Sequence, residues 1–246
     1  IDAGPIGPHE DAGRQVVVPF LRRHGAGRID VLVISHAHAD HLGGARALLD
    51  RIPTGLVTEP GELVSDSLYG GFLDEVAALG IPWRAGRPGD HFELDGVQFR
   101  FLHPDPAWPG WGTDLNEDSL VLLVEYGEFQ ALFSGDIGFP VEQLLKGRVG
   151  PIDLLKVGHH GSAGSSSDAW LSELQPRAAV ISVGVGNRYG HPAPSALARL
   201  AAHHIAIWRT DRDGTVTVQT DGRTLTVRGR RGIERYSTSP TEELSR

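Results

Sequence analysis

Short apolar runs that pass directly into polar clusters recur along this chain of 246 residues. A continuous apolar run of this length is typical of a strand that is buried inside a sheet. The runs cover residues 31–34, 120–124, 131–134, 154–157 and 179–183. Polar clusters follow the first run and the last three, so the pattern predicts a sheet whose strand ends carry the functional residues.

Helical segments alternate with these strands. We expect helices over 15–24, 42–51, 71–79, 167–174 and 195–204, the last with Pro194 and Ser195 in start positions. Residues 97–102 and 215–228 favour antiparallel strands, and the second segment forms a hairpin that turns at Asp221-Gly222. This mixed order predicts an α/β (α+β) sandwich of sheets and helices. We expect one domain over 1–234 and a disordered tail over 235–246, which has almost nothing to bury.

The chain has no cysteine and 12 histidines. Disulfides, thiolate metal sites and cysteine nucleophiles are therefore excluded, so any metal must be held by histidine and carboxylate side chains. The formal net charge is −8, and no basic surface for binding a phosphate backbone stands out. No apolar stretch is long enough to span a membrane, and no export signal opens the chain. Because it begins at Ile1, we expect it to be part of a longer protein.

Four potential metal ligands lie in the six residues after the first strand: His36, His38, Asp40 and His41. In an extended stretch His36 and His38 point the same way and can chelate one ion. A turn after them lets Asp40 and His41 reach a second ion. The cluster predicts a compact binuclear metal site. Unrelated core or surface histidines are the alternative, and that alternative fits a single histidine better than it fits this cluster.

Two later strand ends carry further candidate ligands. Asp136 follows Gly135 at the end of a strand, where its carboxylate can bridge two cations or cap a turn. His159 and His160 lie between glycines, where the backbone can approach a ligand closely. We take His160 as the metal ligand and His159 as a residue that binds substrate, and the residue types alone leave the reverse assignment open.

A fourth polar cluster, Asn-Arg-Tyr-Gly-His-Pro, occupies residues 187–192. Its glycine spacing does not match the dinucleotide-binding fingerprint. An arginine, a tyrosine and a histidine in a tight loop instead suit a cradle for a phosphate oxygen. The alternative is a turn whose polar groups cap neighbouring backbone.

Together these motifs resemble those of the metallo-β-lactamase superfamily. The resemblance implies an αββα sandwich with two metal ions in a cleft at the sheet edges, and β-structure that precedes Ile1. The matching segments are His36-x-His38-x-Asp40-His41 for the second motif, Gly135-Asp136 for the fourth, the His159-His160 pair for the fifth, and residues 1–4 for the end of the first.

Two strings give a narrower resemblance, to the C-terminal domain of ComEC-type competence proteins, which are membrane channels for DNA uptake. They are Leu-Lys-Val-Gly-His-His-Gly-Ser at 155–162 and Asn-Arg-Tyr-Gly-His-Pro at 187–192. The resemblance implies a nuclease attached to a transmembrane channel, at the extracytoplasmic face of the cell membrane. Its implied substrate is DNA, single-stranded rather than double-stranded, namely the strand that is not transported.

The implied cofactors are two divalent metal ions, manganese or zinc, with no organic cofactor. A hydroxide that bridges the metals is expected to attack phosphorus. Expected metal ligands are His36, His38, Asp40, His41, Asp136 and His160. Expected catalytic residues are Asp40, His159 and His191, and expected substrate-binding residues are Asn116, Ser162, Asn187, Arg188 and Tyr189.

Asn116 departs from the superfamily pattern, since many members carry a histidine there. An amide oxygen is a weaker zinc ligand than imidazole, so we expect a more open first metal that tolerates manganese. Two other functions stay open: a small-molecule ester hydrolase, such as a phosphocholine esterase or lactonase, and a non-catalytic module of a DNA transporter. The net charge of −8 favours the ester hydrolase modestly. The loop with Trp108 and Trp111 either stacks bases or packs as a lid.

Overall fold

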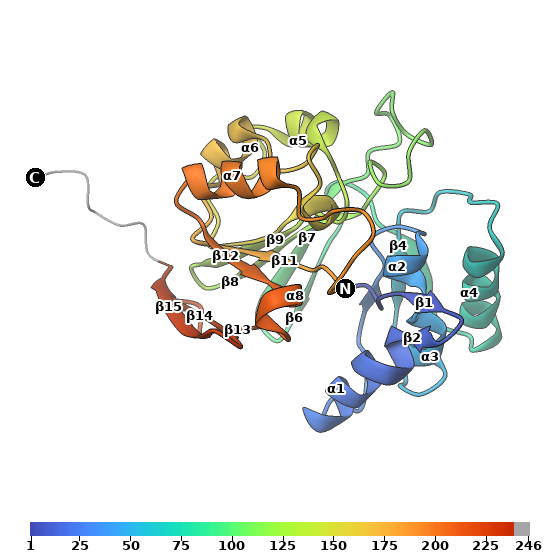
Figure 1. Cartoon of the computed structure of the whole chain (residues 1–246). Helices are drawn as coiled ribbons and strands as arrows, with labels where there is room; N and C mark the ends of the chain where they lie inside the picture. Colours follow the sequence, from blue (N-terminus) through green and yellow to red (C-terminus); the bar gives the residue numbers. More distant parts are fainter. Residues whose placement is uncertain (239–246) are drawn as a thin grey trace, which may run out of the picture. The chain divides into compact units, whose positions relative to one another are not determined.

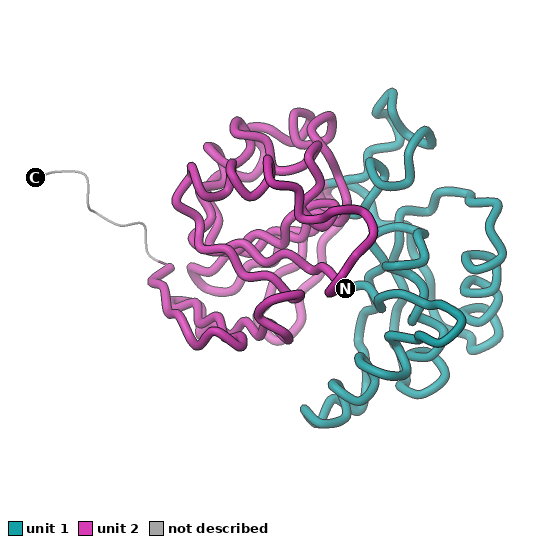
Figure 2. The backbone as a smooth tube through the Cα atoms, in the orientation of Figure 1, with its two compact units in different colours: residues 1–88, 103–120 teal, residues 89–102, 121–246 magenta. Residues whose placement is uncertain are grey.

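The computed structural model describes residues 1–238 (Figure 1). The chain forms two compact units (Figure 2). The first unit contains residues 1–88 and 103–120, and the second contains residues 89–102 and the chain from 121 onward. Among residues 1–238, none of the helices has the length and apolar character that crossing a membrane requires.

The first unit is built on a three-stranded parallel sheet. Its strands are β3 (Leu32–Val33), β4 (Val57–Glu59) and β5 (Trp83–Ala85), in that order. A short hairpin, β1 (Ile6–Gly7) and β2 (Glu10–Asp11), precedes them. The predicted helix over 15–24 is present as a π-helix, η1 (Gly13–Val17), continued by α1 (Val18–Arg23). Buried side chains from the sheet and the helices form one core, which includes Leu32, Ile34, Leu48, Val57 and Phe72.

The helix predicted over 42–51 begins earlier and is divided in two. Helix α2 (Ala39–Leu42) and helix α3 (Ala45–Leu49) are separated by Gly43 and Gly44. A Cβ atom at Gly44 would lie 2.3 Å from both the Ala3 carbonyl oxygen and the Gly13 nitrogen. The backbone of three segments therefore packs directly together, and this contact holds the N-terminal residues against the start of α3.

The predicted start of the helix over 71–79 is wrong. Helix α4 (Ser67–Ala78) begins before the two glycines, because the Asp66 side chain accepts hydrogen bonds from the backbone nitrogens of Leu68 and Tyr69. Aspartate at this position satisfies backbone donors that the first turn of a helix leaves without partners. Gly70 and Gly71 then lie inside the helix despite their low helix propensity.

The second unit is built on a seven-stranded sheet in the order β12-β11-β10-β9-β8-β7-β6. Strands β9, β10, β11 and β12 run parallel, whereas β8 pairs antiparallel with β9 and β6 pairs antiparallel with β7. In chain order the strands are β6 (His91–Leu94), β7 (Val97–His103), β8 (Val121–Tyr126), β9 (Phe129–Phe133), β10 (Leu154–Lys156), β11 (Ala178–Ile181) and β12 (Ala206–Arg209).

Three helices connect the parallel strands and lie along one face of this sheet (Figure 1). They are α5 (Phe139–Leu145), α6 (Asp168–Leu174) and α7 (Pro194–Ala202). The last two confirm predicted helices, whereas α5 was not predicted. Two shorter helices, η2 (Gly158–Gly161) and α8 (Thr210–Asp213), follow β10 and β12. The carboxyl ends of the four parallel strands share one sheet edge, as the apolar runs predicted.

A second sheet in this unit is formed by β13 (Thr217–Thr220), β14 (Thr224–Gly229) and β15 (Gly232–Ser237). The predicted hairpin is confirmed, and the Asp221 side chain accepts hydrogen bonds from the backbone nitrogens of Arg223 and Thr224 at its turn. The predicted disordered tail starts too early, since residues 235–237 belong to β15. Tyr236 packs there against a core cluster that contains Trp208. The rest of that tail, 239–246, lies outside the described residues.

Candidate functional site

The predicted site residues fall into two sets. The first unit carries His36, His38, Asp40, His41 and Asn116, and the second carries Asp136, His159, His160, Ser162 and the loop 187–191. Except for Asn116, which lies between β7 and β8, they follow the carboxyl ends of parallel strands, where side chains from separate loops can converge.

Three donor atoms converge in the first unit. The Nε2 atom of His36 lies 3.0 Å from Nδ1 of His38, which in turn lies 3.0 Å from Oδ1 of Asn116. Two nitrogens bound to one ion at 2.0–2.1 Å in a tetrahedral site lie about 3.3 Å apart, so this spacing fits ligands of a shared metal. Asn116 thus lies within reach of His38, and its predicted substrate-binding role stays a prediction.

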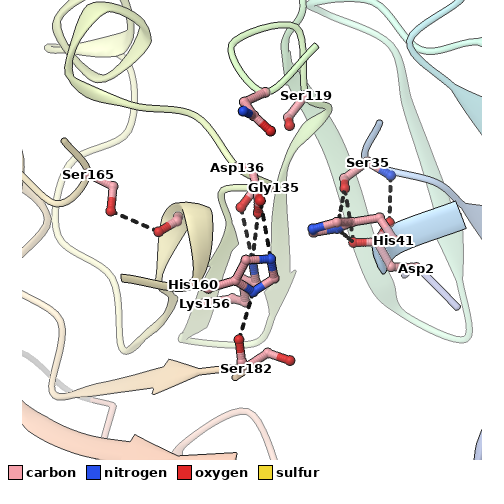
Figure 3. Close-up of polar contacts among 12 residues, drawn as sticks. Asp2, Ser35, His41, Ser119, Gly135, Asp136, Lys156, His160, Ser165 and Ser182 are labelled. Atoms are coloured by element: carbon pink, nitrogen blue, oxygen red, sulfur yellow. Dashed lines mark hydrogen bonds and ion pairs between the residues drawn. The ribbon is translucent and has the colours of Figure 1, made fainter. Parts of the chain in front are cut away.

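Asp2 orients His41, and the prediction of site residues did not include it. Oδ2 of Asp2 accepts a hydrogen bond from Nδ1 of His41 at 2.8 Å, and Ser35 donates to the same carboxylate from its backbone nitrogen and its hydroxyl (Figure 3). A histidine that donates from Nδ1 presents the lone pair of Nε2 to a metal. Residues 1–4 carried the only sequence signal for this role, through their likeness to the first motif.

The surroundings of Asp2 keep its carboxyl group ionised. Burial by itself would raise the pKa, but the charge of His41, its hydrogen bond and the Ser35 backbone N–H hold the pKa of Asp2 well below its usual range. Asp40 differs from these neighbours in being exposed. Its Oδ2 lies 3.9 Å from Nε2 of His41, so these two side chains form the second pair that the sequence predicted.

Asp136 and His160 pair in the second unit (Figure 3). Asp136 is buried just after β9, and its Oδ2 lies 3.3 Å from Nε2 of His160. The Nδ1 atom of His160 lies 2.7 Å from the carbonyl oxygen of Ser182. Because a carbonyl oxygen only accepts, Nδ1 carries the proton and Nε2 keeps its lone pair beside Asp136. Metal-binding histidines are typically oriented in this way, which supports His160 rather than His159 as the ligand.

Lys156 also contacts this carboxylate loop. Its Nζ donates to the Gly135 carbonyl oxygen at 2.9 Å and lies 3.5 Å from Oδ1 of Asp136. The lysine thus compensates the negative charge of Asp136 and fixes the turn that carries it.

The two histidine-containing motifs of the second unit pack against each other. Both His159 and His160 have positive φ angles, 47° and 51°, which non-glycine residues rarely adopt. At Gly161 a Cβ atom would lie 2.7 Å from Cβ of Pro192, so only glycine allows this close approach. The rings of His159 and His191 consequently lie 5.6 Å apart, centroid to centroid.

A charged pair from two helices holds the segment that follows His160. The Glu142 carboxylate on α5 accepts hydrogen bonds from the backbone nitrogens of Ser166 and Ser167. Burial raises the pKa of Glu142, and these N–H groups oppose that rise. Arg199 on α7 donates to three carbonyl oxygens of the same segment, those of Ala163, Ser165 and Ser166. Ser162 closes the preceding turn, where its backbone nitrogen donates to the His159 carbonyl oxygen at 2.8 Å.

The loop 187–191 is braced from within. The Asn187 side chain donates to the carbonyl oxygen of His191 and accepts from its backbone nitrogen, at 2.6 and 2.9 Å. This favours the alternative in which Asn187 caps backbone over its predicted contact with substrate. Arg188 and Tyr189 are exposed. Burial, followed by the charges of His159 and His160, lowers the pKa of His191.

The two tryptophans of the loop 104–114 make contacts within the first unit. The Trp108 ring lies edge-on to His103, with centroids 5.6 Å apart, and the Arg87 guanidinium lies 5.5 Å from the Trp111 ring. A Cβ atom at Gly110 would lie 2.3 Å from the Trp108 ring. These contacts favour a packed loop over a platform that stacks bases.

Comparison with known proteins agrees with these motifs. The family model described as the metallo-β-lactamase superfamily matches residues 1–185. ComE operon protein 3 of Bacillus subtilis (strain 168) is 35% identical over 213 residues, which cover 83% of this chain and 26% of that protein. Competence protein ComA of Neisseria gonorrhoeae is 34% identical over 210 residues, which cover 83% of this chain and 27% of that protein. The chain thus spans about a quarter of the length of the curated relatives it matches.

Among solved structures, CmlA, a diiron β-hydroxylase from Streptomyces venezuelae, aligns with a TM-score of 0.51. The sequences are 19% identical, and the alignment covers 74% of this chain and 44% of that one, so the likeness concerns the fold alone. The predicted α/β class is confirmed. With strand-end histidine and aspartate motifs in both units and a family match over three quarters of its length, the chain belongs to the metallo-β-lactamase superfamily, whose members are usually metal-dependent hydrolases, and is related to competence proteins.

Proposed function

We propose that this chain is a metal-dependent phosphodiesterase domain that degrades DNA, preferentially single-stranded DNA, during DNA uptake. The observation that carries the proposal is the orientation of His160, whose Nδ1 is fixed by the Ser182 carbonyl while Nε2 lies beside the Asp136 carboxylate. The nucleic-acid substrate is supported by the names of two relatives, competence protein ComA of Neisseria gonorrhoeae and Recombination protein 2 of Haemophilus influenzae.

Metal-binding roles fall to residues within each unit. In the first unit the proposed ligands are His36, His38, Asp40 and His41, and in the second they are Asp136 and His160, with manganese or zinc as the divalent ions. When bound, such ions supply an acidified water and neutralise charge on the phosphate. The chain's own residues then position the substrate: His159 and His191, whose rings are neighbours, donate hydrogen bonds to the phosphate oxygens.

The charge of this chain predicts only a weak attraction between the protein and the DNA backbone. The net charge of −8 provides no general attraction for phosphate, so affinity has to come from the metals and a few local contacts. Because the aligned segment covers only about a quarter of the relatives' length, we propose that the domain is attached to a transmembrane channel and acts at the extracytoplasmic face of the membrane.

The test compares cleavage of labelled single-stranded DNA, labelled double-stranded DNA and a phosphocholine ester by purified protein. Each substrate is incubated with the protein free of metal, with manganese and with zinc. We expect metal-dependent cleavage of single-stranded DNA. Cleavage of the ester alone would support the small-molecule hydrolase instead, and no cleavage of any DNA with any divalent metal would refute the proposal.

Two aspartate variants locate the activity. Asp136→Asn is expected to reduce cleavage by roughly 100-fold or more, because even outer partners of a metal site contribute 10- to 100-fold. Asp168→Asn is the matched control, since Asp168 is an exposed aspartate at the start of α6 in the same unit. Equal loss in both variants would point to a folding defect, so the melting temperatures of both are measured in parallel.

A further inference from the structure

The loop between β11 and α7 exposes a large aromatic ring on a braced backbone. Val185 and Tyr189 are 84% and 82% exposed, and Arg188 beside them is also exposed. This loop is held at both ends. Asn187 bonds twice to the His191 backbone at one end. At the other end Thr210 exchanges hydrogen bonds with the backbone of Val183, at 2.7 and 2.8 Å.

The Tyr189 ring lies beside the ring of His191. The two rings are nearly parallel, with an interplanar angle of 19° and centroids 6.1 Å apart. His191 in turn neighbours His159. The tyrosine ring therefore lies next to the histidines of this unit, while its 82% exposure leaves most of the ring open to solvent.

We propose that Tyr189 is a stacking platform for an unpaired nucleobase of the DNA strand whose phosphate contacts His159 and His191. The inference rests on the proposed function and names the feature that selects single strands. A base in a duplex is covered on both faces by its neighbours, whereas an unpaired base can stack on an exposed aromatic ring. Tyrosine suits this purpose because its ring is large and rigid and loses little conformational entropy on binding.

The net negative charge of the chain is the reason that a stacking contact is needed. A protein that lacks a basic groove gains little from the sugar-phosphate backbone, so it needs a contact that does not depend on phosphate charge. Stacking on one aromatic side chain contributes about 1–3 kcal/mol per base, which corresponds to roughly 5- to 150-fold in affinity. Arg188, exposed beside the ring, adds a single cation that can contact a flanking phosphate.

The experiment measures the Kd of the metal-loaded protein by fluorescence anisotropy. Its probes are a labelled oligothymidylate with phosphorothioate linkages that resist hydrolysis, and an abasic strand of the same length and linkage. Tyr189→Leu removes the ring but keeps an apolar side chain, and we expect it to weaken binding of the oligothymidylate by roughly 5- to 150-fold. Tyr189→Phe keeps the ring, and we expect it to bind within about twofold of the wild type.

Tyr126→Leu is the matched control, because Tyr126 is a partly exposed tyrosine at the end of β8, outside the loop. We expect it to bind as the wild type does. A Tyr189→Phe variant as weak as Tyr189→Leu would overturn the proposal in favour of a hydroxyl hydrogen bond to phosphate. An equal loss on the abasic strand, or wild-type binding by Tyr189→Leu, would overturn it as well.

The outcome is separable from that of the proposed function. Ring-dependent binding by a protein that cleaves no DNA would refute the nuclease and uphold the platform. Metal-dependent cleavage of DNA by a protein whose binding ignores Tyr189 would uphold the nuclease and refute the platform.

Discussion

Replacing Gly44 with alanine tests whether backbone packing at the start of α3 holds the histidines of the first unit in place. A Cβ atom there would lie 2.3 Å from the Ala3 carbonyl oxygen and from the Gly13 nitrogen, whereas real Cβ atoms essentially never approach within 3.0 Å. The backbone must therefore yield by about 0.7 Å, the difference between 3.0 and 2.3 Å. Gly44 also donates a hydrogen bond to the Gly4 carbonyl oxygen at 2.9 Å, so the movement disturbs the segment that carries Asp2.

The magnitude follows from three contributions. Overpacking in a closely packed region costs about 1–3 kcal/mol. A weakened hydrogen bond from Gly44 adds about 0.5–1.5 kcal/mol, and alanine is a poorer N-cap residue for α3 than glycine, so nothing offsets these two losses. We expect the free energy of unfolding to fall by roughly 1.5–4.5 kcal/mol, which lowers Tm by about 2–4 °C per kcal/mol in a chain of this size.

Gly70→Ala is the matched control, since nothing lies within 4 Å of a Cβ atom at that position in α4. It should raise the free energy of unfolding by about 1 kcal/mol through helix propensity alone. Urea unfolding of the metal-free variants gives both values, and zinc titration measures the effect on the site. Because Asp2 orients His41, Gly44→Ala should also bind zinc more weakly. Wild-type stability in Gly44→Ala, or lost stability with unchanged zinc affinity, would refute the reasoning.

Two further substitutions probe the first unit. Asn116→His should bind zinc more tightly than the wild type in a chelator competition assay, because it places an imidazole where an amide oxygen now lies 3.0 Å from Nδ1 of His38. An unchanged zinc affinity would mean that Asn116 does not lie at a ligand position. Glu62→Gln tests a carboxyl pair, since burial and then the charge of Asp118 raise the pKa of Glu62 from 4.5 to about 7. Between these two pH values the folded protein keeps the proton on Glu62, whereas the unfolded chain has lost it. The free energy of unfolding should therefore fall as pH rises from about 4.5 to 7. In urea unfolding at a series of pH values, the free energy of unfolding of the glutamine variant should depend less on pH.

Strand ends were the most predictable part of this molecule. An apolar run that stops at Phe133 or Lys156 puts the next residues at the sheet edge whatever the rest of the chain does, so the placement of Asp136 and His160 follows from local sequence. Helix boundaries were less predictable. The cap at Asp66 outweighs two glycines inside α4, and no count of propensities reveals which signal prevails.

Contacts that join distant parts of the chain were the hardest to predict. Asp2 reaches His41 and Ser35 across more than thirty residues, and only the likeness of residues 1–4 to the first motif pointed to it. Asn187 shows the opposite difficulty. Its amide suits a phosphate as well as it suits a backbone, and only the folded loop shows that its hydrogen bonds are made to His191.

Glu142 and Arg199 limit how freely the loop 163–167, which follows His160, can be redesigned. Both side chains bind main-chain atoms, so the shape of residues 163–167 is imposed in large part by α5 and α7. Within the loop, the buried Ser165 hydroxyl adds hydrogen bonds to the Gly158 and Ser162 carbonyl oxygens, so this serine has to be kept when other side chains are exchanged. The same loop moved to another scaffold would lose that path, because five of the hydrogen bonds that define it originate outside the transplanted segment.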